Sequence, residues 1–137
     1  MVKINLDSNL WIALFRLNDS CHTKAVKIFS KLDQQKTQLI ISSLVFAEVC
    51  TVVSQRESRR QAILVGRELR KPELVFDYFD SELDLKTWEL FQKISDKNIS
   101  YVDCGLLALS LQKGYLLATL DGKLQKIAKN FNCPIFR

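Results

Sequence analysis

Residues 99–124 read ISYVDCGLLALSLQKGYLLATLDGKL, and this stretch decides the fold. Asp103 stands where an apolar helix is expected to begin, and Cys104 to Gln112 continue that helix. A glycine break and a short apolar strand follow, and the strand ends at Asp121. Because helices and strands that alternate in this way build one sheet, we expect both carboxylates at one edge of it.

The rest of the chain continues the alternation. Leu39 to Ile41 is a short apolar run without polar interruption, which is typical of a strand buried on both faces of a parallel sheet. Gln55 to Lys71 predicts one helix or two short ones, stopped by Pro72. The expected strands are 2–6, 39–41, 74–76, 116–118 and 134–136. This order predicts an α/β fold with a parallel sheet covered on both faces.

Length and composition are those of one soluble globular domain spanning residues 1–137. The chain has 137 residues, of which 47% are hydrophobic and 26% charged, with few glycines and prolines. The net charge of +5 favours an anionic partner, with nucleic acid as the first expectation.

Nothing in the sequence predicts a membrane span, a signal peptide or a disulfide framework. The apolar runs are short, and the N-terminus lacks a basic start followed by a long apolar segment. The four cysteines are scattered without a Cys-x-x-Cys pair, which favours reduced thiols. A cytoplasmic location is therefore expected.

Four acids, Asp7, Glu48, Asp103 and Asp121, fall at the ends or faces of elements that meet at one edge of such a sheet. Taken singly, each has an ordinary structural role: Asp7 and Asp103 as helix caps, Asp121 in a turn before Gly122, and Glu48 on an outward face. Taken together, they would repel one another and raise their own pKa values unless a cation lay between them.

A hard divalent cation suits such a cluster, because Mg²⁺ and Mn²⁺ prefer oxygen ligands and can activate water beside a phosphodiester. His22 is the only histidine in the chain, so a ribonuclease mechanism with a pair of histidines is excluded and a zinc site is disfavoured. We expect His22 to be a surface or cap residue.

Four segments together resemble the PIN-domain ribonucleases, and most closely toxins of the VapC type. They are Asp7-Ser8-Asn9 after the first strand, Ser43 to Glu48, Asp103 at the start of an apolar helix, and Thr119-Leu120-Asp121 after a strand. The order and spacing of these segments span essentially the whole chain.

The resemblance implies a three-layer α/β/α sandwich around a mostly five-stranded parallel sheet. It also implies that Asp7, Glu48, Asp103 and Asp121 bind Mg²⁺ or Mn²⁺ and cleave RNA, often a structured RNA such as tRNA. Asn9 and Thr119 match polar positions flanking such sites, and either Asp121 or Asp103 would orient the attacking water. A cognate antitoxin and a homodimer are further implications.

The chain departs from the family pattern at two places. Cys104 and Gly105 stand where alanine and an aliphatic residue are commoner, which predicts a looser start of this helix. Lys123 and Leu124 stand where some relatives carry a further acid, so the number of metal ions, one or two, stays open.

A basic segment follows the second predicted strand–helix unit and contains Arg56, Arg59, Arg60, Arg67 and Arg70. These arginines are either a solvated face that pairs with Glu57 and Glu68 or a surface that contacts RNA phosphates. The aromatic residues are expected in the core or in dimer contacts.

Two other functions remain open. A binding module could keep the acidic pocket without turnover, and RNA or protein binding that is independent of Mg²⁺ would identify it. A phosphotransfer enzyme of the dehalogenase type also begins with an aspartate after the first strand, but that family has a second aspartate where Asn9 stands here.

Overall fold

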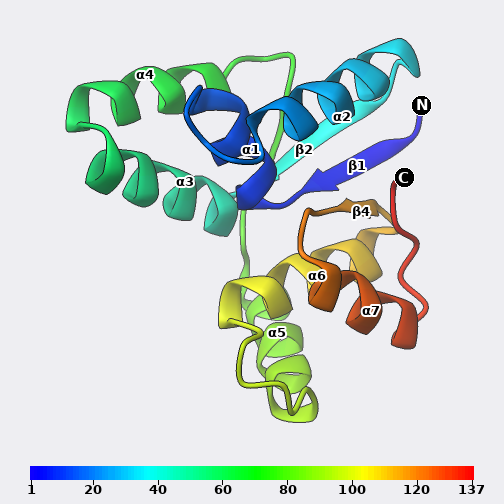
Figure 1. The fold of residues 1–137 in the computed structure, drawn as a ribbon. Helices are drawn as coiled ribbons and strands as arrows, with labels where there is room; N and C mark the ends of the chain where they lie inside the picture. Colours follow the sequence, from blue (N-terminus) through cyan, green and yellow to red (C-terminus); the bar gives the residue numbers. More distant parts are fainter.

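The computed structural model describes residues 1–137 and has the expected α/β architecture (Figure 1). All four strands are parallel and lie in the order β3-β2-β1-β4. The strands are β1 (Lys3–Leu6), β2 (Gln38–Ser42), β3 (Val75–Asp77) and β4 (Leu116–Ala118). The helices are α1 (Ser8–Phe15), α2 (His22–Gln34), α3 (Ser43–Arg56), α4 (Arg59–Leu69), α5 (Ser81–Lys93), α6 (Tyr101–Lys113) and α7 (Gly122–Asn130).

Helices cover both faces of the sheet, as the alternation predicts. In Figure 1, α1 and α2 lie on one side of β1 and β2, whereas α6 and α7 lie on the other side. The chain builds β1, β2 and β3 outward in one direction and then places β4 on the opposite side of β1. The strand order therefore switches next to β1, and ligands of such folds gather at the carboxyl ends of the strands at this point. Asp7 directly follows β1.

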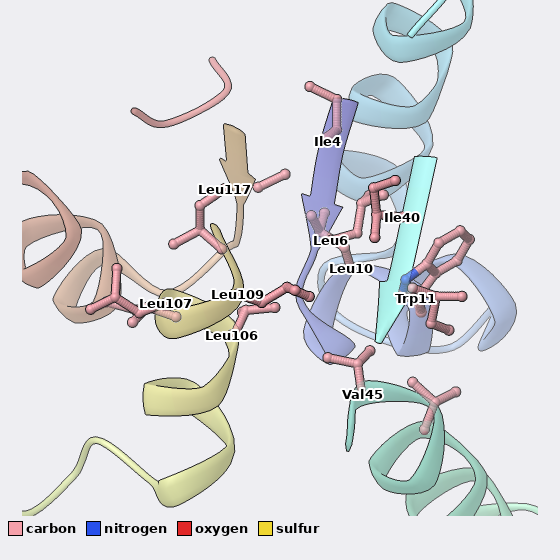
Figure 2. Close-up of a cluster of buried hydrophobic side chains, with 14 of the residues drawn as sticks. Ile4, Leu6, Leu10, Trp11, Ile40, Val45, Leu106, Leu107, Leu109 and Leu117 are labelled. Atoms are coloured by element: carbon pink, nitrogen blue, oxygen red, sulfur yellow. The ribbon is translucent and has the colours of Figure 1, made fainter. Parts of the chain in front are cut away.

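The central strand β1 is buried by side chains from both helical layers. Figure 2 shows Ile4 and Leu6 along β1 in one cluster of buried side chains with Leu10 of α1 and Leu109 of α6. All four side chains are fully buried. Each contributes about 1.5–3 kcal/mol relative to an exposed side chain, so the core fixes the strand whose end carries Asp7.

The expected fifth strand is missing, and the sheet has four strands. In residues 134–136, only Ile135 forms a bridge, parallel to Leu117 of β4. The carbonyl of Pro134 accepts from the Leu117 amide at 3.0 Å, but Pro134 has no amide to donate. The segment therefore adds two hydrogen bonds to the edge of the sheet without becoming a regular strand.

The basic segment resolves into parts of two helices. Helix α3 continues through Arg56, and α4 begins after Ser58, whose hydroxyl caps it by accepting from the Gln61 amide. The sequence was compatible with one helix or with two, and the Ser58 cap begins a second helix.

The start of α6 is tightly packed, so the expectation of a looser start is wrong. A Cβ added at Gly105 would lie 2.8 Å from both Leu44 Cδ1 and Phe79 Cζ, which is closer than van der Waals contact allows. Cys104 is also buried. Glycine therefore permits a close approach of α6 to α3 and to the segment before α5.

All four cysteines are free thiols, two of them buried. None of the helices combines the length and the apolar character needed to cross a membrane.

Candidate metal-dependent nuclease site

Asp7 is the most buried of the four acids, with 3% of its surface exposed. Its carboxylate caps α1 by accepting from the Ser8 amide at 2.7 Å, and it accepts from Thr119 Oγ1 at 2.6 Å. Burial raises the pKa of Asp7 to about 6 against the lowering effect of the Thr119 and Ser8 hydrogen bonds, and the charges of Asp103 and Glu48 raise it further. The cap role expected for Asp7 alone is therefore real, but it does not account for this environment.

Glu48 lies on α3 with its side chain half-buried and thus not on a fully outward face. The Ser8 hydroxyl donates to Glu48 Oε1 and also lies 3.3 Å from Asp7 Oδ1. Ser8 thus links the first acid of the chain to the second. The sequence indicated Ser8 only as a possible cap residue, although a hydroxyl directly after Asp7 was a usable signal.

Asp103 lies in the first turn of α6 and not at its cap, which is Ser100. The Ser100 hydroxyl accepts from the Asp103 amide at 3.1 Å, and Asp103 Oδ2 accepts from the Ser100 amide at 2.9 Å. This reciprocal pair is a capping box. Burial raises the pKa of Asp103 although these hydrogen bonds lower it, and the charge of Asp121 adds to the rise.

Asp121 caps α7, a role that combines the turn expected at Asp121-Gly122 with a helix start. Its Oδ1 accepts from the Lys123 amide at 2.9 Å, and its own amide donates to Thr119 Oγ1 at 3.1 Å. The cap uses Oδ1 of Asp121. The other carboxylate oxygen, Oδ2, has no protein partner within hydrogen-bond distance.

Thr119 and Asn9, the two expected flanking residues, hold the site together. Thr119 Oγ1 donates to Asp7 and accepts from the Asn9 side-chain amide at 3.2 Å. Asn9 Oδ1 accepts from the Leu120 amide at 3.3 Å. The end of β1 is thereby tied to the end of β4, two segments more than a hundred residues apart in sequence.

The four predicted acids lie near one another at the carboxyl edge of the sheet, linked in pairs rather than converging on one point. Electrostatic repulsion connects Glu48 with Asp7, Asp7 with Asp103, and Asp103 with Asp121. Glu48 and Asp121 line one open pocket of about 350 Å³, together with a further acid, Asp19, and with Arg56, and we call it the acidic pocket. Asp7 and Asp103 do not line it. A series of like charges with a solvent-accessible opening is an arrangement that attracts a cation.

The fit of a divalent cation depends on the donor atoms. No group of three or more His, Cys, Asp or Glu side chains is arranged so that it could hold a metal ion. Mg²⁺, however, usually keeps several waters and needs only one or two carboxylates together with substrate phosphates. One or two of the four carboxylates suffice for that chemistry, and the raised pKa values of Asp7 and Asp103 mark where positive charge would be most stabilising.

The predicted RNA-binding arginines do not form one surface. Arg56 lines the acidic pocket, whereas Arg59, Arg67 and Arg70 line a separate groove between α3 and α4, and Arg60 lines neither. Arg70 stacks on Phe46, with its guanidinium carbon 4.2 Å from the ring centroid.

Glu57 and Glu68, the two acids expected to pair with these arginines, have other partners. Glu57 pairs with Arg16 at 2.7 Å, and Glu68 pairs with Lys71 at 2.8 Å. The arginines of α4 are therefore largely uncompensated, and their contact with RNA stays a prediction.

His22 is the first residue of α2, directly after the Cys21 cap, and is half-buried, with its ring Nδ1 2.7 Å from the Ala13 carbonyl.

The family profile described as "PIN domain" matches residues 4–130. No curated protein sequence matches the chain.

Solved structures match over nearly the whole chain. The sarcin-ricin loop cleaving toxin VapC20 from Mycobacterium tuberculosis has a TM-score of 0.79 at 20% identity, covering 91% of this chain and 94% of that one. FitAcB from Neisseria gonorrhoeae has a TM-score of 0.70 at 18% identity, covering 99% and 97%. VapBC2 from Rickettsia felis, bound to a DNA fragment from its promoter, has a TM-score of 0.68 at 19% identity, covering 100% and 98%. At these identities the likeness shows the fold.

Proposed function

Because the chain belongs to the PIN-domain family, we propose that it is a metal-dependent endoribonuclease and the toxin of a toxin–antitoxin pair. We further propose that residues 1–137 act as a single domain. The observation that carries the proposal is the series of four carboxylates near the strand-order switch, in which Glu48 repels Asp7, Asp7 repels Asp103 and Asp103 repels Asp121, with the pKa values of Asp7 and Asp103 raised.

The proposed chemistry is hydrolysis of an RNA phosphodiester. When bound, Mg²⁺ or Mn²⁺ would offset the carboxylate charge, lower the pKa of a coordinated water and shield the phosphate. Asp7 is held rigid by Thr119 and the Ser8 amide, so it is suited to a fixed ligand position. Asp103 and Asp121 are less buried, and one of them would orient the attacking water.

The test is cleavage of a labelled RNA by purified protein with Mg²⁺, Mn²⁺ or EDTA. EDTA is expected to abolish cleavage, and Asp103→Asn to reduce it by a factor of roughly a hundred or more, as loss of a catalytic acid or base does. Asp33→Asn is the matched control, because Asp33 is exposed at the end of α2.

Cleavage by Asp103→Asn at the parent rate would refute the proposed site. Metal-independent RNA binding without any cleavage would favour the non-catalytic binding module.

The groove between α3 and α4 suits a protein partner such as an antitoxin. It has a volume of about 660 Å³, with Phe46, Ala62 and Ile63 as apolar lining and Arg59 and Arg67 beside them. An amphipathic segment with acidic residues flanking an apolar stripe complements this surface in both shape and charge. Solved relatives determined as VapBC and FitAB complexes support a partner of this kind.

Helix α5 offers a face for a homodimer. Leu85, Trp88 and Phe91 recur at every third position and are 63%, 49% and 40% exposed. Large apolar side chains gathered on one exposed face commonly mark an interface.

The charges on α5 complement a second copy of the same helix. If two antiparallel copies cross with the symmetry axis between Thr87 and Trp88, each Glu82 lies beside a Lys93 and each Lys86 beside a Glu89. Such a self-complementary patch is what a two-fold symmetric dimer requires. Trp88→Asp is expected to shift the protein to monomer in analytical ultracentrifugation, whereas Leu17→Asp, at an exposed leucine elsewhere, is not. An unchanged mass for Trp88→Asp would exclude this interface.

A further inference from the structure

A second pocket lies beside the acidic site, on the α2 side of the sheet. It has a volume of about 310 Å³, near the lower end of the range for small-ligand sites. Its basic lining comes from Lys24, Lys27 and Lys31, and its apolar lining includes Ile28 and Phe136. We call it the α2 lysine pocket.

The lysines of this pocket have almost no internal partners. They are spaced at i, i+3 and i+7 on α2, so they share one face of the helix. None of the five ion pairs in the structure includes them. Lys31 donates to the Arg137 backbone carbonyl and lies 5.4 Å from the Phe136 ring centroid. Lys24 and Lys27, which have no side-chain partner, therefore present uncompensated positive charge beside an apolar floor, and Arg137 also lines the pocket.

The α2 lysine pocket and the acidic pocket are direct neighbours. Leu120 lines both, and Thr119, which donates to Asp7, lines the α2 lysine pocket. The Gln125 side chain donates to the Thr119 carbonyl at 2.8 Å and fixes this shared segment. An extended ligand that lies across Leu120 would occupy both pockets at once.

Electrostatics gives a reason for this arrangement. An RNA phosphate that approaches four carboxylates is repelled, and one or two divalent cations offset only part of that charge. Lysines in the adjacent pocket would bind the neighbouring phosphate of the RNA and so reduce the net repulsion between the RNA and the acidic site. The apolar floor with its aromatic ring can receive a base, because every base has a face that stacks on aromatic groups.

We propose that the α2 lysine pocket binds the nucleotide next to the scissile phosphate of a single-stranded or looped RNA. This inference rests on the proposed ribonuclease function, and it names a surface different from the arginines of α4. The α4 arginines border an apolar groove on the other side of α3, and Arg70 is already stacked on Phe46 and Phe76.

The experiment measures binding and cleavage separately. A fluorescein-labelled single-stranded RNA of about 16 nucleotides is titrated with the Asp103→Asn protein in EDTA, and anisotropy is followed over a range of salt concentrations. The same substitutions are then placed in the active protein and cleavage of the RNA is measured. The test pair is Lys24→Gln with Lys27→Gln.

Two charge-matched pairs serve as controls. Lys97→Gln with Lys129→Gln removes two exposed lysines that line neither pocket, and Arg59→Gln with Arg67→Gln removes two cations from the α3–α4 groove. Circular dichroism melts verify that each protein is folded.

The Lys24 and Lys27 pair is expected to weaken RNA binding about tenfold and to lower the slope of log affinity against log salt by about 2, whereas the controls change each by much less. In the active protein, KM should rise more than kcat falls, because these lysines do not touch the reacting atoms.

The inference is overturned if the test pair binds RNA like the parent protein, if any control pair weakens binding equally, or if the parent does not bind the RNA. If Asp103→Asn abolishes cleavage but the Lys24→Gln, Lys27→Gln variant binds RNA as tightly as the parent, the proposed function is retained and only this inference fails. Cleavage that survives Asp103→Asn would instead remove the proposed function.

Discussion

The acidic pocket and the α3–α4 groove are built on two faces of one helix, α3. Glu48, Val52 and Arg56 line the acidic pocket. Phe46, Cys50 and Ser54 line the groove. Both sets repeat every four residues, so each forms one stripe along the helix.

A third stripe of α3, formed by Val45, Val49 and Val53, is buried in the core and separates the two hollows. A polar site and an apolar groove can therefore share a short helix, because its helical period sends them in different directions. The difference also predicts that the two faces can be altered independently.

The largest effect on activity is expected from substitutions that each alter only one of the two faces of α3. Glu48→Gln should reduce RNA cleavage by a factor of a hundred to a thousand, which corresponds to about 3–4 kcal/mol of lost transition-state stabilisation, and should leave binding of a protein partner unchanged. Ile63→Glu on the groove side should do the reverse, because it places a charge on the apolar lining.

Cleavage rates and isothermal titration with the purified partner measure the two effects. If either substitution impaired both activities in a folded protein, the two faces would not be independent.

The second prediction concerns the pH dependence of stability in metal-free protein. The pKa of Asp7 is about 6 in the folded state against 3.8 ordinarily, so the folded protein binds more protons between these pH values. The free energy of unfolding should therefore fall as pH rises from about 4 to about 6, by up to roughly 3 kcal/mol from this group. Asp7→Asn should remove this fall.

Denaturant melts in EDTA at several pH values test the Asp7 prediction. Asparagine keeps an Oδ1 that can accept from the Ser8 amide, but its amide nitrogen replaces the oxygen that accepts from Thr119 Oγ1, and this loss acts at every pH. The diagnostic result is thus the slope against pH, and parallel profiles for parent and variant would contradict the raised pKa.

The smallest effect is expected from a matched pair of glycines. Gly105→Ala should destabilise the protein by about 1–3 kcal/mol, because its Cβ would collide with Leu44 and Phe79. Gly66→Ala on the groove side should stabilise it by up to about 1 kcal/mol, because its Cβ would lie 3.5 Å from Cys50 and Phe46 and alanine favours the helix. Thermal melts measure both, and equal shifts would show that the two sides of α3 are packed alike.

Much of the fold was predictable because it is encoded locally. The apolar run at Leu39 to Ile41 became β2, and the Ser42 cap and helical period after it became α3. The absence of a fifth strand could not be predicted from the sequence. Residues 134–136 have the composition of a strand, but only Ile135 pairs with the sheet. Strand pairing depends on what the sheet edge offers, and composition does not report that.

The four acids of the site were predictable as residues, since each stands at the end or face of an expected element, but their partners were not. Glu57 was expected near the arginines, and instead it pairs with Arg16, 41 residues earlier. The link from Ser8 to Glu48 and the pocket beside Leu120 likewise join segments that are distant in sequence.

Sequence alone was enough for the alternation of elements, for the caps at Asp7 and Asp121, and for the placement of four carboxylates at ends or faces of elements that a parallel sheet brings to one edge. Those features follow from backbone preferences and side-chain periods within a few residues. The tertiary structure alone decided that Ser8 and Thr119 hold the acids together, that α3 separates an acidic pocket from an apolar groove, and that lysines of α2 lie next to the acids. Such juxtapositions depend on how helices pack on the sheet, and long-range packing is not encoded in any one segment.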